Sequence, residues 1–253
     1  MLMRLLLLIA LALPLPTLAQ LRWVEGKHYL TLSSGQTAET RPGKVEVAEV
    51  FSYGCIYCYK AVENVAKLKA ELPPDAYMTY VHAAFIPSEA WPMYQRAWYT
   101  AQAMGIGEAN HRKMFAAVWE TREVPFQGSD GAIRKPLPSI QEAARFYARA
   151  AMVKEADFLK TADSPAVNAQ IARADQLIKA WSVSGTPAFV VNGRYMIKSD
   201  AVSSWTDIQS LITFLIGQER RRLAQASAAP ATQTPAKPAP ARPAPTKPAS
   251  AKP

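Results

Sequence analysis

The two cysteines of this 253-residue chain are the residues that first suggest chemistry, because Cys55 and Cys58 form a single C-x-x-C pair. A largely apolar run over 45–51, typical of a buried strand, precedes them, and apolar residues recur at helical spacing over 61–72 after them. The pair is therefore expected where a strand leads into a helix. Unpaired N–H groups and the helix dipole stabilise a thiolate at a helix N-terminus, so this placement favours a redox-active dithiol.

Two other uses of a cysteine pair fit this chain less well. A structural zinc ion needs four ligands, and the three histidines His28, His82 and His111 lack the spacing of zinc ligands. A purely structural disulfide usually closes a longer loop, although it stays open as an alternative. We therefore expect a redox function that uses neither a metal nor a cofactor.

Residues 1–19 have the pattern of a cleaved signal peptide: a basic Arg4, an apolar run over 5–13 and a small-residue site ending at Ala19. A retained membrane anchor is the alternative. The apolar run is shorter than a bilayer requires, and two prolines follow it at 14 and 16. We therefore expect export to an oxidising compartment, where one C-x-x-C pair suggests thiols that act on other proteins.

The other end of the chain, over 226–253, is rich in alanine, proline and lysine and has no acidic residue. Such a composition cannot bury enough apolar surface to fold, so we predict a disordered tail. Loose contact of this tail with an anionic envelope surface is a second possibility. Of the formal charge of +9, Arg4 and the four basic residues of the tail account for five, and the remaining +4 gives no support for nucleic-acid binding.

The first half of the folded part predicts a parallel βαβ unit. A strand over 45–51, a helix after the cysteines and a second strand over 77–83 follow one another, and such a crossover is right-handed by default. From Trp91 to Trp181 the pattern is helical, with four or so helices. Ser139 and Glu142 form a capping-box pattern at the start of one of them.

The second half of the folded part predicts a hairpin and a final helix. Apolar residues over 188–191 and 195–197 flank Asn192-Gly193, which is typical of two strands on a type I′ turn. The last helix is expected over about 205–218, before a run of arginines.

Thr186-Pro187 lies immediately before the first strand of this hairpin. Proline lacks an N–H donor, so it belongs at the first residue or the edge of a strand. A cis bond there would leave the preceding backbone groups free to pair with an extended ligand. Alone, Pro187 would be an ordinary turn proline; together with the upstream C-x-x-C pair, it indicates a substrate-binding position.

Taken together, these motifs resemble the thioredoxin superfamily, and more closely the DsbA-type periplasmic thiol:disulfide oxidoreductases. The resemblance covers roughly 21–217 and rests on three segments, 25–32, 49–59 and 183–193. It implies an α/β, thioredoxin-like fold with a helical domain inserted between its βαβ and ββα halves. The implied division is a signal peptide over 1–19, a thioredoxin-like domain over 20–87 and 181–225, a helical insertion over 88–180 and a disordered tail over 226–253.

The resemblance also implies roles for individual residues. Cys55 would be the exposed nucleophile of low pKa and Cys58 its buried partner, and the two would form the redox-active disulfide. Pro187 would be a cis-proline facing that disulfide, with Thr186 presenting its backbone to the substrate. The protein would then oxidise reduced or unfolded exported proteins in the periplasm as a monomer, and a DsbB-type quinone-linked membrane oxidase would reoxidise it.

Two features depart from the family pattern. The dipeptide between the cysteines is Ile56-Tyr57, whereas the family most often has Pro-His, so we expect a less acidic Cys55. Glu49 matches a buried acid of the family, but the position of its usual lysine partner holds Tyr80. Glu49 is thus either a proton acceptor for Cys58 or a plain strand residue, and His82 is expected to serve in packing.

Two rival functions remain open. A disulfide reductase or isomerase would use the same dithiol, although isomerases usually carry a dimerisation domain, for which residues 21–44 are too few. A folding helper without catalysis would bind peptides beside Pro187 and keep the disulfide for structure.

Overall fold

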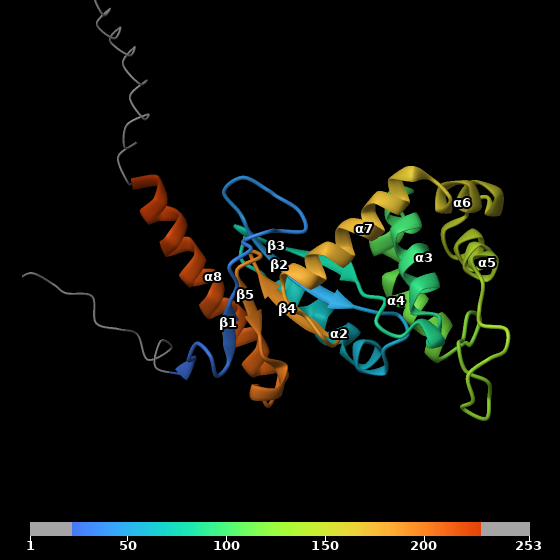
Figure 1. Cartoon of the computed structure of the whole chain (residues 1–253), viewed down its shortest axis with the longest axis horizontal. Helices are drawn as coiled ribbons and strands as arrows, with labels where there is room; N and C mark the ends of the chain where they lie inside the picture. Colours follow the sequence, from blue (N-terminus) through green and yellow to red (C-terminus); the bar gives the residue numbers. More distant parts are fainter. Residues whose placement is uncertain (1–21, 229–253) are drawn as a thin grey trace, which may run out of the picture.

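The computed structural model describes residues 22–228, and the expected signal peptide and the tail beyond Ala228 lie outside the described residues. A five-stranded sheet in the order β1-β5-β4-β2-β3 forms the centre of the fold (Figure 1). Its strands are β1 (Tyr29–Thr31), β2 (Val45–Phe51), β3 (Ala76–His82), β4 (Ala188–Val191) and β5 (Tyr195–Ile197).

The middle of the sheet is β2, which is buried along its whole length. It pairs in parallel with β3 and antiparallel with β4, and Val50 lies opposite Ala188 in the second pairing. Burial on both faces explains the nearly continuous apolar run over 45–51. Because the chain leaves β2 at Phe51, the carboxyl end of the central strand positions Cys55.

Helices cover both faces of the sheet. One core cluster joins Val45 and Val47 to α2 and α8, and the other joins Ala48 and Val50 to α3, α4, α5 and α7. This division follows from the alternation of side chains along a strand. The helices and short 3₁₀ turns are α2 (Ile56–Glu71), η1 (Pro87–Glu89), α3 (Trp91–Ala103), α4 (Gly107–Trp119), α5 (Ile140–Ala151), α6 (Glu155–Ala162), α7 (Pro165–Ala180), η2 (Ser199–Ala201) and α8 (Trp205–Ala228).

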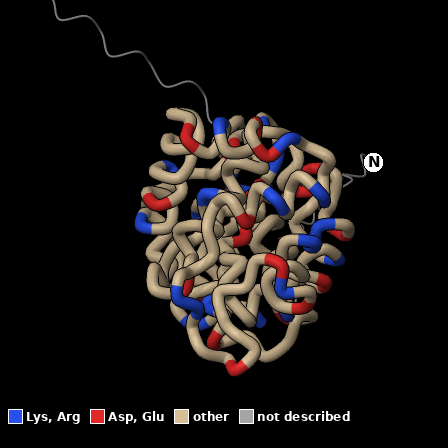
Figure 2. Tube along the Cα trace, turned by 90° about the vertical axis from the view of Figure 1, so that its right-hand side faces the viewer, with Lys and Arg blue, Asp and Glu red and all other residues tan. Residues whose placement is uncertain are grey.

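The helices α3 to α6 stand together at one end of the molecule, and α7 runs from that end back to the sheet; all five helices lie between β3 and β4 in the sequence (Figure 1). The predicted capping box is present, because Ser139 Oγ accepts from the Glu142 N–H and a Glu142 carboxylate oxygen accepts from the Ser139 N–H. On the face that these helices form, basic and acidic residues are interspersed (Figure 2). Among residues 22–228, no helix is both long enough and apolar enough to cross a membrane.

The predicted end of the last helix was wrong. It was placed near Gln218, but α8 continues to Ala228, so residues 226–228 belong to the helix rather than to the tail. Burial explains the extension: Glu219 is fully buried and accepts a hydrogen bond from Asn192 Nδ2 at 2.7 Å, and Leu223 packs against the core. The prediction took the arginines after Glu219 as the C-terminus of the helix. Because Glu219 and Leu223 are held by the core, the helix continues through those arginines instead.

Candidate active site

Cys55 lies at the N-cap of α2, and Cys58 in the first turn of the same helix. The loop between β2 and α2 is held by its own backbone, because the Cys55 N–H donates to the Ser52 carbonyl at 3.0 Å. Cys58 is fully buried, and Cys55 keeps 7% of its surface exposed. Both are free thiols, so the structure describes the reduced dithiol. Cys55 was predicted to be exposed, but in this structure both cysteines are buried, Cys58 completely and Cys55 almost completely.

The structure brings the two distant sequence motifs together. The Cys55 thiol donates to the Thr186 carbonyl at a sulfur–oxygen distance of 3.4 Å. The Thr186–Pro187 bond is cis, as predicted. This meeting depends on the sheet, because β4 begins directly after Pro187 and pairs with β2.

The environment separates the acidities of the two thiols. The pKa of Cys55 is lowered to about 6, chiefly because Cys58 hydrogen-bonds to its sulfur. Burial opposes this shift, whereas the Thr186 side chain, rather than its carbonyl, and the N–H groups of Cys58 and Tyr57 add to it. Burial raises the pKa of Cys58 well above its usual range, and the adjacent Cys55 adds to this shift. At neutral pH, Cys55 is therefore largely a thiolate and Cys58 a thiol.

Glu49 lies in β2 below the dithiol, with 2% of its surface exposed. Burial, and then the negative charge of Cys55, raise the pKa of its carboxyl to about 8. Its neighbour across the strand pair is Tyr80, and no hydrogen bond or ion pair within residues 22–228 reaches the Glu49 carboxyl. At neutral pH this carboxyl is mostly protonated. Because it lies below the dithiol and titrates near pH 8, it can give a proton to a cysteine sulfur or take one from it.

Tyr57 and Ile56 have different surroundings. Tyr57 is 68% exposed and lines a groove of about 460 Å³ beside Thr186 and Pro187, whereas Ile56 is half-buried and does not line it. Among the described residues, the Tyr57 hydroxyl makes no hydrogen bond to Cys55, so the stabilisation that it could offer the thiolate is absent. The apolar part of the groove comes from residues near the hairpin and α8: Phe189, Ile197, Val202, Trp205 and Ile208.

His82 does more than pack. Its Nε2 accepts from the Tyr53 N–H at 3.2 Å, and its Nδ1 is 2.9 Å from the Ala83 carbonyl, to which a protonated Nδ1 donates. Burial lowers the pKa of His82 to about 3, so the ring stays neutral. The imidazole therefore fixes the backbone two residues before Cys55.

Sequence analysis missed two tryptophans that also hold this loop. The Trp119 indole N–H donates to the Tyr53 carbonyl at 2.8 Å. A methyl group added at Gly54 would lie 2.6 Å from Trp91 Nε1, so Trp91 packs directly on the loop. Both tryptophans are in the helical segment, and no local pattern around the cysteines points to them.

No group of three or more His, Cys, Asp or Glu side chains in residues 22–228 could hold a metal ion.

Comparison with known proteins agrees with this geometry. A family described as the DSBA-like thioredoxin domain matches residues 46–212. The thiol:disulfide interchange protein DsbA of Pseudomonas aeruginosa is 30% identical over 198 residues, which cover 78% of this chain and 86% of the relative. The DsbA of Bordetella parapertussis is 32% identical over 170 residues, which cover 67% of this chain and 73% of the relative.

Solved structures give the same result. The crystal structure of the oxidoreductase DsbA from Xylella fastidiosa has a TM-score of 0.68 and 30% identity, and the match covers 78% of this chain and 98% of that one. A crystal structure of Pseudomonas aeruginosa DsbA has a TM-score of 0.67 and 29% identity, with coverage of 80% and 97%.

Proposed function

This chain belongs to the DsbA-like thioredoxin family, and from that membership we propose that it donates a Cys55–Cys58 disulfide to exported proteins while they fold. It is a thiol:disulfide oxidoreductase with a thioredoxin-like fold that carries a helical insertion. The observation that carries the assignment to these residues is the contact between the Cys55 thiol and the Thr186 carbonyl.

The proposed reaction exchanges one disulfide for another. A substrate thiolate attacks Cys55 Sγ of the oxidised protein, the Cys55–Cys58 bond breaks, and Cys58 leaves with the electron pair. A second substrate thiolate then attacks the substrate sulfur of the mixed disulfide and releases Cys55 as a thiolate. The substrate loses two electrons and two thiol protons. The protein gains the two electrons, Cys58 takes up one of the protons, and the other passes to solvent because Cys55 is released as a thiolate.

The low pKa of Cys55 supports the direction of transfer. A thiolate that is stable at neutral pH is a good leaving group, and its stability favours the reduced protein over the oxidised one. Electrons therefore flow from substrate to protein. Glu49, with a pKa of about 8, is suited to supply or accept the proton of Cys58.

The substrate is proposed to lie along Thr186-Pro187 as an extended chain. The groove that contains Tyr57, Pro187 and Trp205 would then bind its apolar side chains. We propose that Ile56 and Tyr57, the two residues between the cysteines, tune the pKa of Cys55. Tyr57 acts through its backbone N–H and not through its hydroxyl.

Further parts of the proposal concern the cell. We assign the protein to the periplasm after cleavage of residues 1–19, as a monomer that a DsbB-type quinone-linked membrane oxidase reoxidises. We also divide the folded chain into a thioredoxin-like part over 20–87 and 181–228, with the predicted end at 225 moved to the end of α8, and a helical insertion over 88–180. The support is the family membership and the grouping of α3 to α6.

Transfer of the disulfide to a reduced peptide tests the function directly. Oxidised protein mixed with an unfolded peptide that holds two free cysteines should form one peptide disulfide per protein molecule, measured by mass spectrometry. Cys55→Ser should abolish transfer. Cys58→Ser, mixed instead with the peptide in its disulfide form, should hold a mixed disulfide on Cys55, because Cys55 attacks the peptide disulfide, one peptide thiol leaves, and no Cys58 is present to resolve the bond. Binding of the peptide without any transfer by the unmodified protein would instead favour the non-catalytic folding helper.

The equilibrium with glutathione separates oxidase from reductase. An oxidase should remain reduced at glutathione ratios that oxidise ordinary dithiols, because its thiolate form is stabilised. If the Cys55–Cys58 pair is instead oxidised at the same glutathione ratios as ordinary dithiols, the protein is a reductase or isomerase rather than an oxidase.

A further inference from the structure

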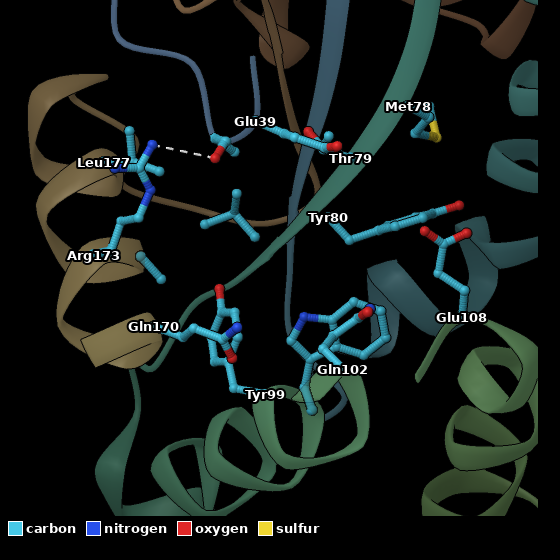
Figure 3. Close-up of a pocket in the computed structure, with 14 residues that line it drawn as sticks. Glu39, Met78, Thr79, Tyr80, Tyr99, Gln102, Glu108, Gln170, Arg173 and Leu177 are labelled. Carbon is cyan, nitrogen blue, oxygen red and sulfur yellow. Dashed lines mark hydrogen bonds between the residues drawn. The ribbon is translucent and has the colours of Figure 1, made fainter. Parts of the chain in front are cut away.

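A second groove, of about 330 Å³, lies along the outer edge of β3 and shares no lining residue with the groove beside Pro187. β3 is the last strand in the sheet order, so its outer edge has no strand neighbour. Figure 3 shows β3 crossing this groove between α7, which carries Arg173 and Gln170, and α3, which carries Tyr99 and Gln102.

The hydrogen bonds at the ends of β3 show which of its backbone groups face the groove. The Asp75 carbonyl accepts from the Val45 N–H at 2.8 Å, and the Ala83 N–H donates to the Phe51 carbonyl at 2.7 Å. Since adjacent residues of a strand turn their backbone groups in opposite directions, the odd-numbered residues of β3 bond to β2. The even-numbered residues therefore face the groove.

Side chains occupy only one end of this free edge. The His82 N–H donates to the Tyr99 hydroxyl at 3.2 Å, and the His82 carbonyl accepts from Gln95 Nε2 at 2.9 Å. Among residues 22–228, no hydrogen bond reaches the backbone of Met78 or Tyr80, the two even-numbered residues beside it. Each of them offers one N–H and one carbonyl to an incoming chain.

A cation stands beside these backbone groups. Arg173 Nη2 donates to the backbone carbonyls of Thr37 at 3.0 Å and Ala38 at 3.2 Å, which fix the guanidinium at the rim of the groove. No carboxylate among the described residues pairs with it, so its remaining N–H donors are available to a carboxylate.

The acids of the groove do not oppose this charge. Glu39 accepts two hydrogen bonds from Arg41, at 2.9 and 3.0 Å, and Glu108 is paired with Lys69. Each acid that lines the groove is thus paired with a cation of its own, whereas Arg173, among the lining residues, has no acidic partner. The Asp175 carboxylate lies beyond the His82 end of the edge, where it accepts from Gln95 Nε2 at 2.9 Å.

We propose that this edge binds an extended peptide segment of another protein, which adds to β3 as a further strand and places an acidic side chain on Arg173. The backbone of Met78 and Tyr80 supplies up to four hydrogen bonds, and the bonds at His82 end the pairing. At a rise of about 3.4 Å per residue, this stretch accommodates roughly three to five residues. The site is independent of the dithiol and of the function proposed above.

Amide exchange tests the free edge. In isotope-labelled protein followed by NMR, the Met78 and Tyr80 amides should exchange faster than those of Thr79 and Val81, which bond to β2. Addition of the cysteine-free peptide acetyl-Ser-Val-Glu-Val-Thr-amide should slow the first two and leave the others unchanged. The same peptide with every central amide N-methylated lacks the donors for strand pairing and should have no effect.

Variants test the charge. Arg173→Gln should weaken peptide binding about five- to tenfold, through loss of a charge-assisted hydrogen bond. Arg145→Gln, which removes an exposed cation of α5 outside the groove, should leave it unchanged. Cys55→Ser should abolish disulfide transfer and keep peptide binding, so failure of one proposal is distinguishable from failure of the other.

Three results would overturn the inference. One is peptide-induced shifts at Thr186 and Tyr57 instead of at β3. Another is equal binding by the Arg173→Gln variant. The third is slow exchange at Met78 and Tyr80 without peptide together with a doubled sedimenting mass, which would assign the edge to a second copy of this chain.

Discussion

The Cys55 sulfur receives its stabilisation from neighbours on its own helix and from Thr186, and none of it from an imidazole. Tyr57, the second residue between the cysteines, is exposed and lines the groove. The pKa of Cys55 near 6 is therefore the product of Cys58 and of the backbone at the helix N-terminus.

Tyr57→His should lower the pKa of Cys55 by about one unit, because an imidazolium beside the sulfur favours its charged form. It should also shift the equilibrium with glutathione toward the reduced protein. The measurement is thiolate absorbance as a function of pH. Tyr57→Phe is the matched control and should leave the pKa near 6, since the hydroxyl makes no bond to Cys55; an unchanged pKa in the histidine variant would sink the explanation.

At the level of single residues, sequence reasoning can propose a site where the spacing itself suggests the chemistry. Cys55, Cys58 and Pro187 could be identified because a C-x-x-C pair and a proline before a strand are local patterns. The hydrogen bonds of His82 could not, since they need the Tyr53 N–H, 29 residues away, to come within 3.2 Å. A residue such as His82, whose role depends on partners far away in the sequence, has no local sequence pattern that would identify it.

The loop between β2 and α2 depends on a residue without a side chain. Gly54 faces the Trp91 indole, and a methyl group there would lie 2.6 Å from Nε1, well inside van der Waals contact. The rigid indole cannot turn aside as a flexible side chain would, so the loop itself must move.

Gly54→Ala should destabilise the protein by about 1–3 kcal/mol through overpacking. It should also raise the pKa of Cys55, because the loop would carry the sulfur away from Thr186. Chemical denaturation and thiolate titration measure the two effects. Gly185→Ala is a suitable control for stability, since an added methyl group there meets nothing within 4 Å; equal stability of the two variants would contradict the packing argument.

The elements themselves were largely predictable, and their errors have physical causes. The strand over 45–51 and the hairpin at Asn192-Gly193 follow from periodicity and turn chemistry, which are local. The end of α8 was missed because Glu219 looks like an exposed acid in the sequence, whereas the fold buries it against Asn192. The short α6 was not singled out, because its eight residues bury only Phe158 and Ala162.

For the molecule as a whole, the dithiol links stability to pH. The folded pKa of Cys55, about 6, is below its ordinary value of 9.0, so its contribution is fully present above pH 9 and is lost as the pH falls toward 6. The raised pKa of Cys58 acts in the opposite direction, but only above pH 9. Glu49 titrates in both the reduced and the oxidised protein, so comparing the two forms removes most of its contribution to the free energy of unfolding.

The free energy of unfolding of the reduced protein, relative to the oxidised protein, should therefore rise between pH 6 and pH 9. We expect a change of about 2 kcal/mol, since solvent screens part of the interaction at Cys55. Denaturant unfolding of both forms at each pH gives the difference. Reduced Cys55→Ser should lack the rise, and a difference that falls toward pH 9 would show that Cys58 or Glu49 dominates.

The contact between Cys55 and Thr186 joins residues 131 positions apart. The two cysteines are therefore synthesised well before Thr186, and β2 is synthesised well before its partner β4. Until β4 has paired with β2, the cysteines lack the neighbour that Thr186 provides. The site is therefore complete only when both halves of the chain have reached the same compartment and folded together.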